Sequence, residues 1–159
     1  MMSEYGNLYE KSGRYVLAFE RNFPFNPEEV FRVISDPDYF SQWYPFATGE
    51  MDLKVGGEIK FDDGEGSTYV GKISHLDAPH SFCFQEVDDL LEMKIQGLDS
   101  GCVLTFIHTF DDPTMAMYIA TGWHRCLDVL SKLIYGQPIE WENNVAELRD
   151  YYRDSFHVE

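Results

Sequence analysis

One long amphipathic helix constrains the fold of this chain more than any other feature. Between residues 114 and 136, large apolar residues recur at i, i+4, i+7, i+8 and i+11, which places them along one face of an α-helix. A helix of about 22 residues is roughly 33 Å long and crosses a whole small domain. The sequence therefore predicts a rod packed along a sheet, with an apolar face made of Ile119, Trp123, Cys126, Leu127, Leu130, Leu133 and Ile134.

Both ends of this helix are marked in the sequence. Asp111 and Asp112 supply a capping carboxylate, and Pro113 suits a first helical turn. Gly136, followed by Pro138, supplies the stop at the other end.

The part of the chain before this helix is rich in strand patterns. Apolar and polar residues alternate from Tyr15 to Phe23 and suit a strand with one covered face. Short turns separate the later runs, which favours antiparallel neighbours because parallel strands need long crossovers. The sequence predicts an antiparallel sheet of about seven strands, with runs at residues 14–23, 51–53, 58–61, 69–76, 81–87, 90–96 and 102–110.

Shorter helices are expected before and after the meander. Asn26 as a cap and Pro27 at the first position begin one helix, and Asp36 begins a second that runs through Trp43. After the long helix, apolar residues recur at i, i+4, i+7, i+11 and i+15 from Trp141 onward. This pattern predicts one more amphipathic helix, packed on the domain surface or against a second copy of the chain.

Charge and length exclude several classes of protein. With 159 residues, of which 44% are hydrophobic, the chain is expected to form one domain with one core. Its 28 acidic and 12 basic residues give a formal net charge of −16, so we expect no nucleic acid and no anionic membrane as a partner. The acidity is typical of plain solubility, and a protein partner that used it would carry a basic surface.

Nothing in the sequence is typical of export or membrane insertion. The N-terminus lacks the basic start and apolar run of a secretory signal, and no run of about eighteen apolar residues could span a membrane. Cys83, Cys102 and Cys126 lie in apolar patterns without a close-spaced pair, as reduced core residues do. These features predict a cytoplasmic protein with no membrane span.

Short motifs in a fixed order carry a resemblance to a known family. They are Phe25-Asn26-Pro27-Glu28-Glu29-Val30-Phe31 with Ser35-Asp36-Pro37 and Trp43, Val55-Gly56-Gly57 before Phe61, Thr105-Phe106-Ile107-His108-Thr109-Phe110, and Gly122-Trp123-His124-Arg125-Cys126-Leu127-Asp128. In this order and spacing, roughly residues 14–137 resemble the family named for the activator of heat-shock-protein-90 ATPase. That family lies within the START-like superfamily, also called SRPBCC or birch-pollen-allergen-like.

The resemblance implies an α+β helix-grip fold, in which a curved antiparallel sheet wraps round a long C-terminal helix. Two short helices follow the first strand, and one extra helix follows the long one. The chain then divides into a flexible N-terminal arm (residues 1–13), a START-like domain (14–137) and an additional C-terminal helix packed on that domain (138–159). Members of the family include a domain of a eukaryotic co-chaperone and small bacterial proteins with no assigned reaction.

A sheet that grips a helix leaves room for a cavity between them. Aromatic and methionine side chains on its walls would favour an apolar or aromatic ligand over a sugar or a phosphate. The alternative is that these side chains simply fill the core. The candidate ligand-binding residues are Trp43, Phe61, Tyr69, Phe82, Phe84, Met93, Phe106, His108, Ile119 and Trp123.

His108 is the sharpest polar candidate, because strand alternation places it on the same face as Phe106. It could donate to a ligand carbonyl or act as a base, or it could be a satisfied histidine at the sheet edge. His124 is expected to point outward or toward the last helix, where Asp128, one turn on, could pair with it. No residues match a metal site, a cofactor motif or a catalytic constellation, so none is assigned.

Three functions remain open from the sequence. The favoured one is a non-enzymatic START-like domain that binds a small apolar molecule, as a monomer or a homodimer. The second is a protein-interaction module or stress-response co-chaperone. The third is a cyclase- or hydrolase-type enzyme that uses His108 with Tyr69 or Tyr118, and it requires these groups to converge within hydrogen-bond reach.

Overall fold

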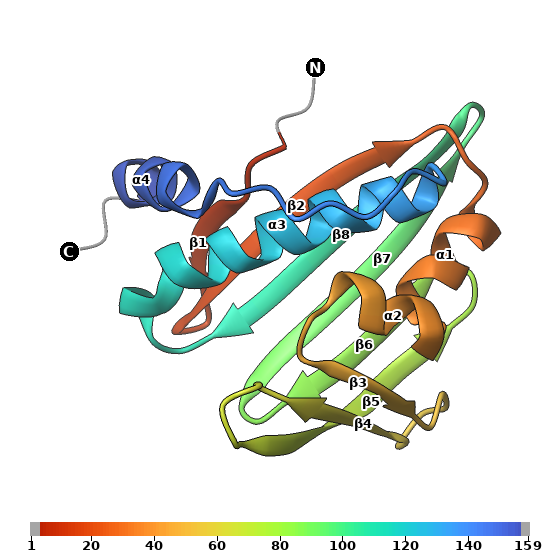
Figure 1. Cartoon of the computed structure of the whole chain (residues 1–159), viewed down its shortest axis with the longest axis horizontal. Helices are drawn as coiled ribbons and strands as arrows, with labels where there is room; N and C mark the ends of the chain where they lie inside the picture. The colour runs from red at the N-terminus through yellow and green to blue at the C-terminus, as the bar shows by residue number, and fades with distance from the viewer. Residues whose placement is uncertain (1–3, 157–159) are drawn as a thin grey trace.

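A single antiparallel sheet forms the body of the molecule in the computed structural model, which describes residues 4–156. Its eight strands follow the order β1-β2-β8-β7-β6-β5-β4-β3 (Figure 1). The strands are β1 (Asn7–Lys11), β2 (Arg14–Phe23), β3 (Ala47–Met51), β4 (Glu58–Asp62), β5 (Thr68–Asp77), β6 (Ser81–Glu86), β7 (Asp89–Leu98) and β8 (Gly101–Phe110). The helices are α1 (Pro27–Ser35), α2 (Pro37–Trp43), α3 (Ala116–Ile134) and α4 (Val145–Phe156), with a short 3₁₀ turn, η1 (Pro113–Met115), before α3.

This architecture confirms the predicted helix-grip fold, and it adds one strand. The predicted runs overlap β2 through β8, although the run at residues 51–53 shares only Met51 with β3 (Ala47–Met51). β1 lies inside the segment that was expected to be a flexible arm. β1 pairs with β2 through a tight turn in which Ser12 and Gly13 both have positive φ, 54° and 80°. This geometry suits a two-residue hairpin. The strand is hard to recognise in the sequence because most of its side chains are exposed. Residues 1–3 of that segment lie outside the described residues.

The long helix α3 lies along the sheet and buries one face (Figure 1). Its start and stop follow the predicted signals. The Asp112 carboxylate accepts the Thr114 N–H at 3.0 Å and caps η1, which leads into α3. At the other end, Gly136 has φ +70° and donates to Leu133, while the Gln137 N–H donates to the Lys132 carbonyl. These paired bonds form a Schellman motif, which needs a residue that tolerates positive φ.

The short helices α1 and α2 fill the part of the sheet that α3 does not cover. Phe40 of α2 packs edge-on against Phe82 and Phe84 of β6, with ring centroids 6.0 and 5.9 Å apart. The Trp43 side chain is fully buried, and its Nε1–H donates to the Val33 carbonyl of α1 at 3.0 Å. This end of the space between sheet and helices is therefore solid core.

The last helix, α4, packs on α3 and on the N-terminal segment, and one phenol of α4 contacts both. Tyr152 is fully buried; its hydroxyl accepts the Gly6 N–H at 3.0 Å and lies 2.8 Å from His124 Nδ1. The Tyr152 hydroxyl therefore links His124 to the N-terminal segment. The other ring nitrogen of His124, Nε2, lies 3.6 Å from Asp128, which also pairs with Arg21 at 2.9 Å. His124 therefore faces the last helix and Asp128, as the sequence suggested.

This contact predicts a pH dependence of stability. Burial lowers the pKa of His124, with a smaller lowering from Arg21 and opposing contributions from Asp128 and Glu4. A histidine that resists protonation when folded contributes stability that is complete above its unfolded pKa of about 6.5 and is lost as pH falls from there to the folded pKa. We expect the free energy of unfolding, measured with urea at several pH values, to fall more steeply over this range for the wild type than for His124→Gln. If the free energy of unfolding depends on pH in the same way in both proteins, His124 is not the source of the pH dependence.

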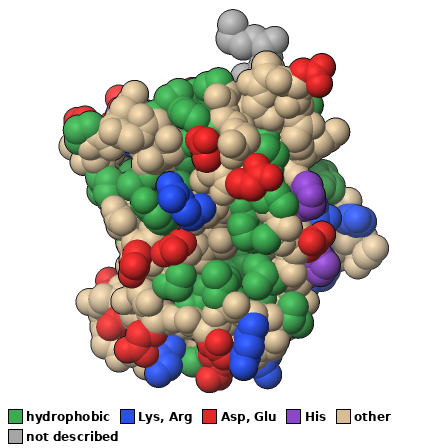
Figure 2. Space-filling model, turned by 90° about the vertical axis from the view of Figure 1, so that its right-hand side faces the viewer, with side chains coloured by type: hydrophobic (Ala, Val, Ile, Leu, Met, Phe, Trp, Pro, Cys, Tyr) green, Lys and Arg blue, Asp and Glu red, His purple; other side chains and the backbone are tan. Residues whose placement is uncertain are grey.

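The surface shows how the chain's acidity is distributed. On the face shown in Figure 2, Asp and Glu side chains are spread among Lys and Arg side chains, and hydrophobic side chains lie near the middle. On that face the charge does not gather into one acidic patch. Within residues 4–156, no helix is both long and apolar enough to cross a membrane.

Candidate functional site

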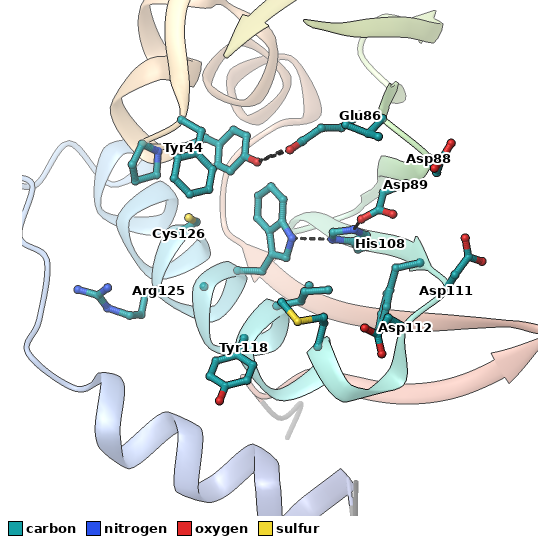
Figure 3. A pocket seen from close by; sticks show the side chains of 18 of the residues that line it. Tyr44, Glu86, Asp88, Asp89, His108, Asp111, Asp112, Tyr118, Arg125 and Cys126 are labelled. Carbon is teal, nitrogen blue, oxygen red and sulfur yellow. Dashed lines mark hydrogen bonds and ion pairs between the residues drawn. The ribbon is translucent and has the colours of Figure 1, made fainter. Parts of the chain in front are cut away.

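A cavity of about 760 Å³ opens between the sheet and the first half of α3. Its walls come from the segment after α2, the turn between β6 and β7, the end of β8, α3 and the segment that connects α3 to α4 (Figure 3). The lining residues are Tyr44, Pro45, Phe46, Glu86, Val87, Asp88, Asp89, His108, Phe110, Asp111, Asp112, Met115, Tyr118, Ile119, Gly122, Trp123, Arg125, Cys126 and Trp141.

Trp123 forms the central wall of this cavity. Its ring stacks on Tyr44 with centroids 4.7 Å apart and planes at 22°, and it also contacts Phe106 at 4.3 Å. The Trp123 side chain is only 5% exposed, so its position is fixed by packing. Flat aromatic faces held in place in this way suit apolar and aromatic ligands.

His108 is tied on both sides of its ring. Nδ1 accepts the Trp123 Nε1–H at 2.8 Å, and Nε2 lies 2.8 Å from Asp89 Oδ2 (Figure 3). An indole nitrogen can only donate, so Nδ1 carries no proton and Nε2–H donates to the carboxylate. His108 is thus a neutral link between Asp89 and Trp123, and neither nitrogen is free to take a proton from a substrate.

Glu86 forms the second polar group of the cavity. It accepts hydrogen bonds from the hydroxyls of Tyr44, at 3.1 Å, and of Tyr69. Burial raises the pKa of Glu86 above its ordinary value, although the two phenols act in the opposite direction. Glu86 sits directly opposite Asp89 in the β6–β7 pairing. The turn between them contains Val87 with φ +57°, a conformation that costs a β-branched residue energy.

The remaining cavity side chains offer no nucleophile or metal site. Complete burial raises the pKa of the Cys126 thiol to about 12, so it stays protonated at neutral pH. Arg125 donates to the Glu142 carbonyl at 3.1 Å and lies over the Trp141 ring at 5.6 Å. Across residues 4–156, no three His, Cys, Asp or Glu side chains are grouped so that they could hold a metal ion.

Only some of the candidate ligand-binding residues line this cavity. His108, Ile119 and Trp123 do. Tyr69 is half-buried and contacts Glu86 from outside the cavity lining. Its ring stacks on that of Phe61, with centroids 5.1 Å apart. Phe40 of α2 covers Phe82 and Phe84, whereas Phe106 packs against Trp123 of α3. The remaining candidates are at most 1% exposed and belong to the core: they are Trp43, Phe61, Phe82, Phe84, Met93 and Phe106.

Several lining residues escaped the sequence analysis. The alternation of Phe82, Phe84 and Glu86 along β6 could have shown that Glu86 faces inward. Tyr44 lies outside strands and helices, where no periodicity fixes the direction of a side chain. Trp141 was predicted to belong to the last amphipathic helix, but α4 begins at Val145, so the helical pattern does not apply to Trp141. Gly122 lines the cavity because it has no side chain to fill the space beside it. The pattern of residues in the sequence does not reveal such an empty space.

The enzyme hypothesis requires His108 to meet a tyrosine within hydrogen-bond reach. In the structure its ring nitrogens contact Asp89 and Trp123 instead, while the Tyr69 hydroxyl bonds to Glu86. Tyr118 lies under the side chain of Arg149, 5.1 Å from its guanidinium carbon to the ring centroid. The predicted catalytic pairing is therefore not formed among the described residues.

Comparisons with known proteins agree on the architecture. The family model described as "Activator of Hsp90 ATPase homolog 1-like protein" matches residues 24–134. The sequence finds no match among curated proteins.

Solved structures with the same fold are distant in sequence. EF2215 from Enterococcus faecalis, described as a conserved protein of unknown function, superposes with a TM-score of 0.83 at 13% identity, covering 96% of this chain and 90% of its own. CalU16 from Micromonospora echinospora gives 0.77 at 19% identity and 96% coverage of both chains. MLL2253 from Mesorhizobium loti gives 0.64 at 14% identity, covering 78% of this chain and 99% of its own. At such identities the likeness concerns the fold alone.

Proposed function

Because this chain belongs to the activator of Hsp90 ATPase homolog 1-like family, within the START-like superfamily, we propose that it is a non-enzymatic binding domain for a small molecule. The ligand is apolar or aromatic over most of its surface and enters the cavity between the sheet and α3. Three of the candidate residues, His108, Ile119 and Trp123, contact it.

The observation that carries this proposal is the cavity itself. Its volume of about 760 Å³ falls within the roughly 300–1,000 Å³ typical of small-molecule sites. Aromatic rings from four separate segments of the chain converge on it: Tyr44 and Phe46, Phe110, Tyr118 and Trp123, and Trp141. A few fixed polar groups among apolar walls are the usual means by which such a site orients a ligand.

The alternative roles have less support from the described residues. A co-chaperone role follows from the family description alone and does not require a cavity. An enzymatic role would need an acid or base that is free to transfer a proton, and His108 is engaged on both nitrogens.

Native mass spectrometry of the purified protein tests the proposal most directly. We expect a reproducible small mass that is released on mild denaturation, or, if the ligand is lost on purification, a thermal shift with a neutral aromatic probe such as phenylbutanol. The same spectrum reports whether the protein is a monomer or a homodimer. The absence of both a bound mass and a shift from a panel of apolar and aromatic compounds would overturn the proposed function.

A further inference from the structure

Two carboxylates from paired strand positions, Glu86 and Asp89, line one wall of the cavity: Glu86 extends toward Tyr44 and Asp89 toward His108 (Figure 3). The β6–β7 register places Glu86 directly opposite Asp89 across a two-residue turn. Side chains alternate along a strand, so Glu86 shares its face with Phe84, and Asp89 shares its face with Leu91. That face is the buried one that the helices cover. Like charges directly opposite each other destabilise a strand pair, so this arrangement does not serve the stability of the sheet.

Neither carboxylate forms an ion pair with a Lys or Arg side chain of the described residues. Glu86 accepts from two neutral phenols, and Asp89 accepts from the neutral ring of His108. Among residues 4–156, no Lys or Arg nitrogen lies within the 4.0 Å of an ion pair from either group. Arg14 forms its ion pair with Asp111 at 2.7 Å, and it reaches Asp89 only through longer-range attraction: its hydrogen bond to Asp111 raises the pKa of Arg14, and the charges of Asp111, Asp89 and Asp88 raise it further. Burial raises the pKa of Glu86; the two phenols and His108 act in the opposite direction, and the charge of Asp89 adds a smaller raising contribution.

The other charged residues of the cavity are also divided between two sides, with the acidic ones beside Asp89. Asp88, Asp111 and Asp112 lie on the same side as Asp89, whereas Arg125 lies on the opposite side (Figure 3). Arg125 is the one Lys or Arg side chain among the described lining residues, and the Glu142 carbonyl and the Trp141 ring already engage it. Aromatic rings, among them Tyr44 and Trp123, occupy the space between the two sides. Ring faces next to carboxylates are the usual surroundings of a bound organic ammonium group.

Building on the proposed function, we infer that the ligand is an organic cation. It carries a protonated or quaternary amine next to Glu86 and Asp89 and an apolar or aromatic body against Trp123. The pair of carboxylates selects against acids of the same shape, since a negative ligand would meet two carboxylates that have no Lys or Arg ion-pair partner on that wall. The cavity is thus a site for amphiphilic amines rather than for fatty or aromatic acids.

Three probes with the same apolar body and different charge test this inference. Phenylbutylamine, phenylbutanol and phenylbutyrate are titrated into the full-length protein by calorimetry at physiological ionic strength, where distant surface charges are screened. We expect the amine to bind at least about tenfold more tightly than the alcohol, and the acid to bind most weakly. In Glu86→Gln and in Asp89→Asn, the preference for the amine should fall to about twofold or less.

Matched measurements separate the possible outcomes. Affinity for the neutral phenylbutanol reports whether each variant keeps its fold and cavity, and it should change by less than about twofold. Glu20→Gln removes one charge from an exposed position on β2 and should keep the full preference for the amine. If the alcohol binds and the amine binds no better, or if Glu20→Gln loses the preference equally, the inference is wrong and the proposed function stands. If none of the three probes binds, the inference of a cationic ligand and the proposed binding function are both overturned.

Discussion

Replacement of Gly122 by leucine is expected to abolish binding of apolar probes while leaving the fold at least as stable as that of the wild type. Gly122 lies on α3 and lines the cavity, and a Cβ placed there meets no atom within 4 Å. A leucine side chain would therefore project into the empty space that the ligand needs. Its helix propensity is better than that of glycine by roughly 0.8 kcal/mol, which favours the folded state.

Two measurements check this expectation. The affinity for phenylbutanol should fall at least about a hundredfold, close to 3 kcal/mol of binding free energy, while the urea midpoint stays equal or rises. Gly122→Ala is the matched control, because it gains most of the helix propensity but adds a single methyl group. It should keep its affinity within a few-fold. A Gly122→Leu protein that is stable and still binds the probe with wild-type affinity would place the ligand elsewhere.

Replacement of Trp43 by alanine is expected to cost about 3–5 kcal/mol of unfolding free energy, the range for removing a large aromatic side chain from a packed core. Trp43 is fully buried, packs edge-on against Phe40 with centroids 5.0 Å apart, and donates to the Val33 carbonyl. Its removal would leave a void between α1 and α2 and would free that buried carbonyl. Denaturant unfolding followed by circular dichroism measures the loss as a lower midpoint.

Trp141→Ala provides the contrast, because Trp141 is 37% exposed and lies at the cavity mouth. It contacts Arg125 in a cation–π arrangement that is worth about 0.5–1 kcal/mol at exposed sites. We expect the Trp141 variant to change stability by no more than about that amount and to weaken probe binding. Equal losses of stability in the two variants would show that the assignment of Trp43 to the core and Trp141 to the cavity is wrong.

The division between core and cavity is where prediction from the sequence reached its limit. Strand alternation correctly placed Phe82, Phe84 and Phe106 on the inner face. It could not tell whether an inner residue meets another side chain or an empty space. Phe40 of α2 decides this for β6, since its ring packs against both phenylalanines. Two residues further along the same strand, Glu86 extends beyond that contact and lines the cavity.

His108 shows the same limit for a single side chain. Its inward direction followed from its position two residues after Phe106. Its chemical state depends on Trp123, fifteen positions further along the chain, whose indole N–H leaves only one tautomer. No spacing within β8 contains that information.

Local sequence patterns were enough to predict most elements of this protein: the approximate limits of α3, the caps of α1 and α2, the alternation of the strands and the order that gives a helix-grip fold. These are local properties, because propensity, capping and periodicity act over a few neighbouring residues. Three features came from tertiary packing: β1 joins the sheet, α1 and α2 close one end of the core, and the β6–β7 turn with Glu86 and Asp89 is left lining an open cavity. These depend on contacts between residues far apart in the chain, where packing of the whole molecule determines which space is filled and which stays open.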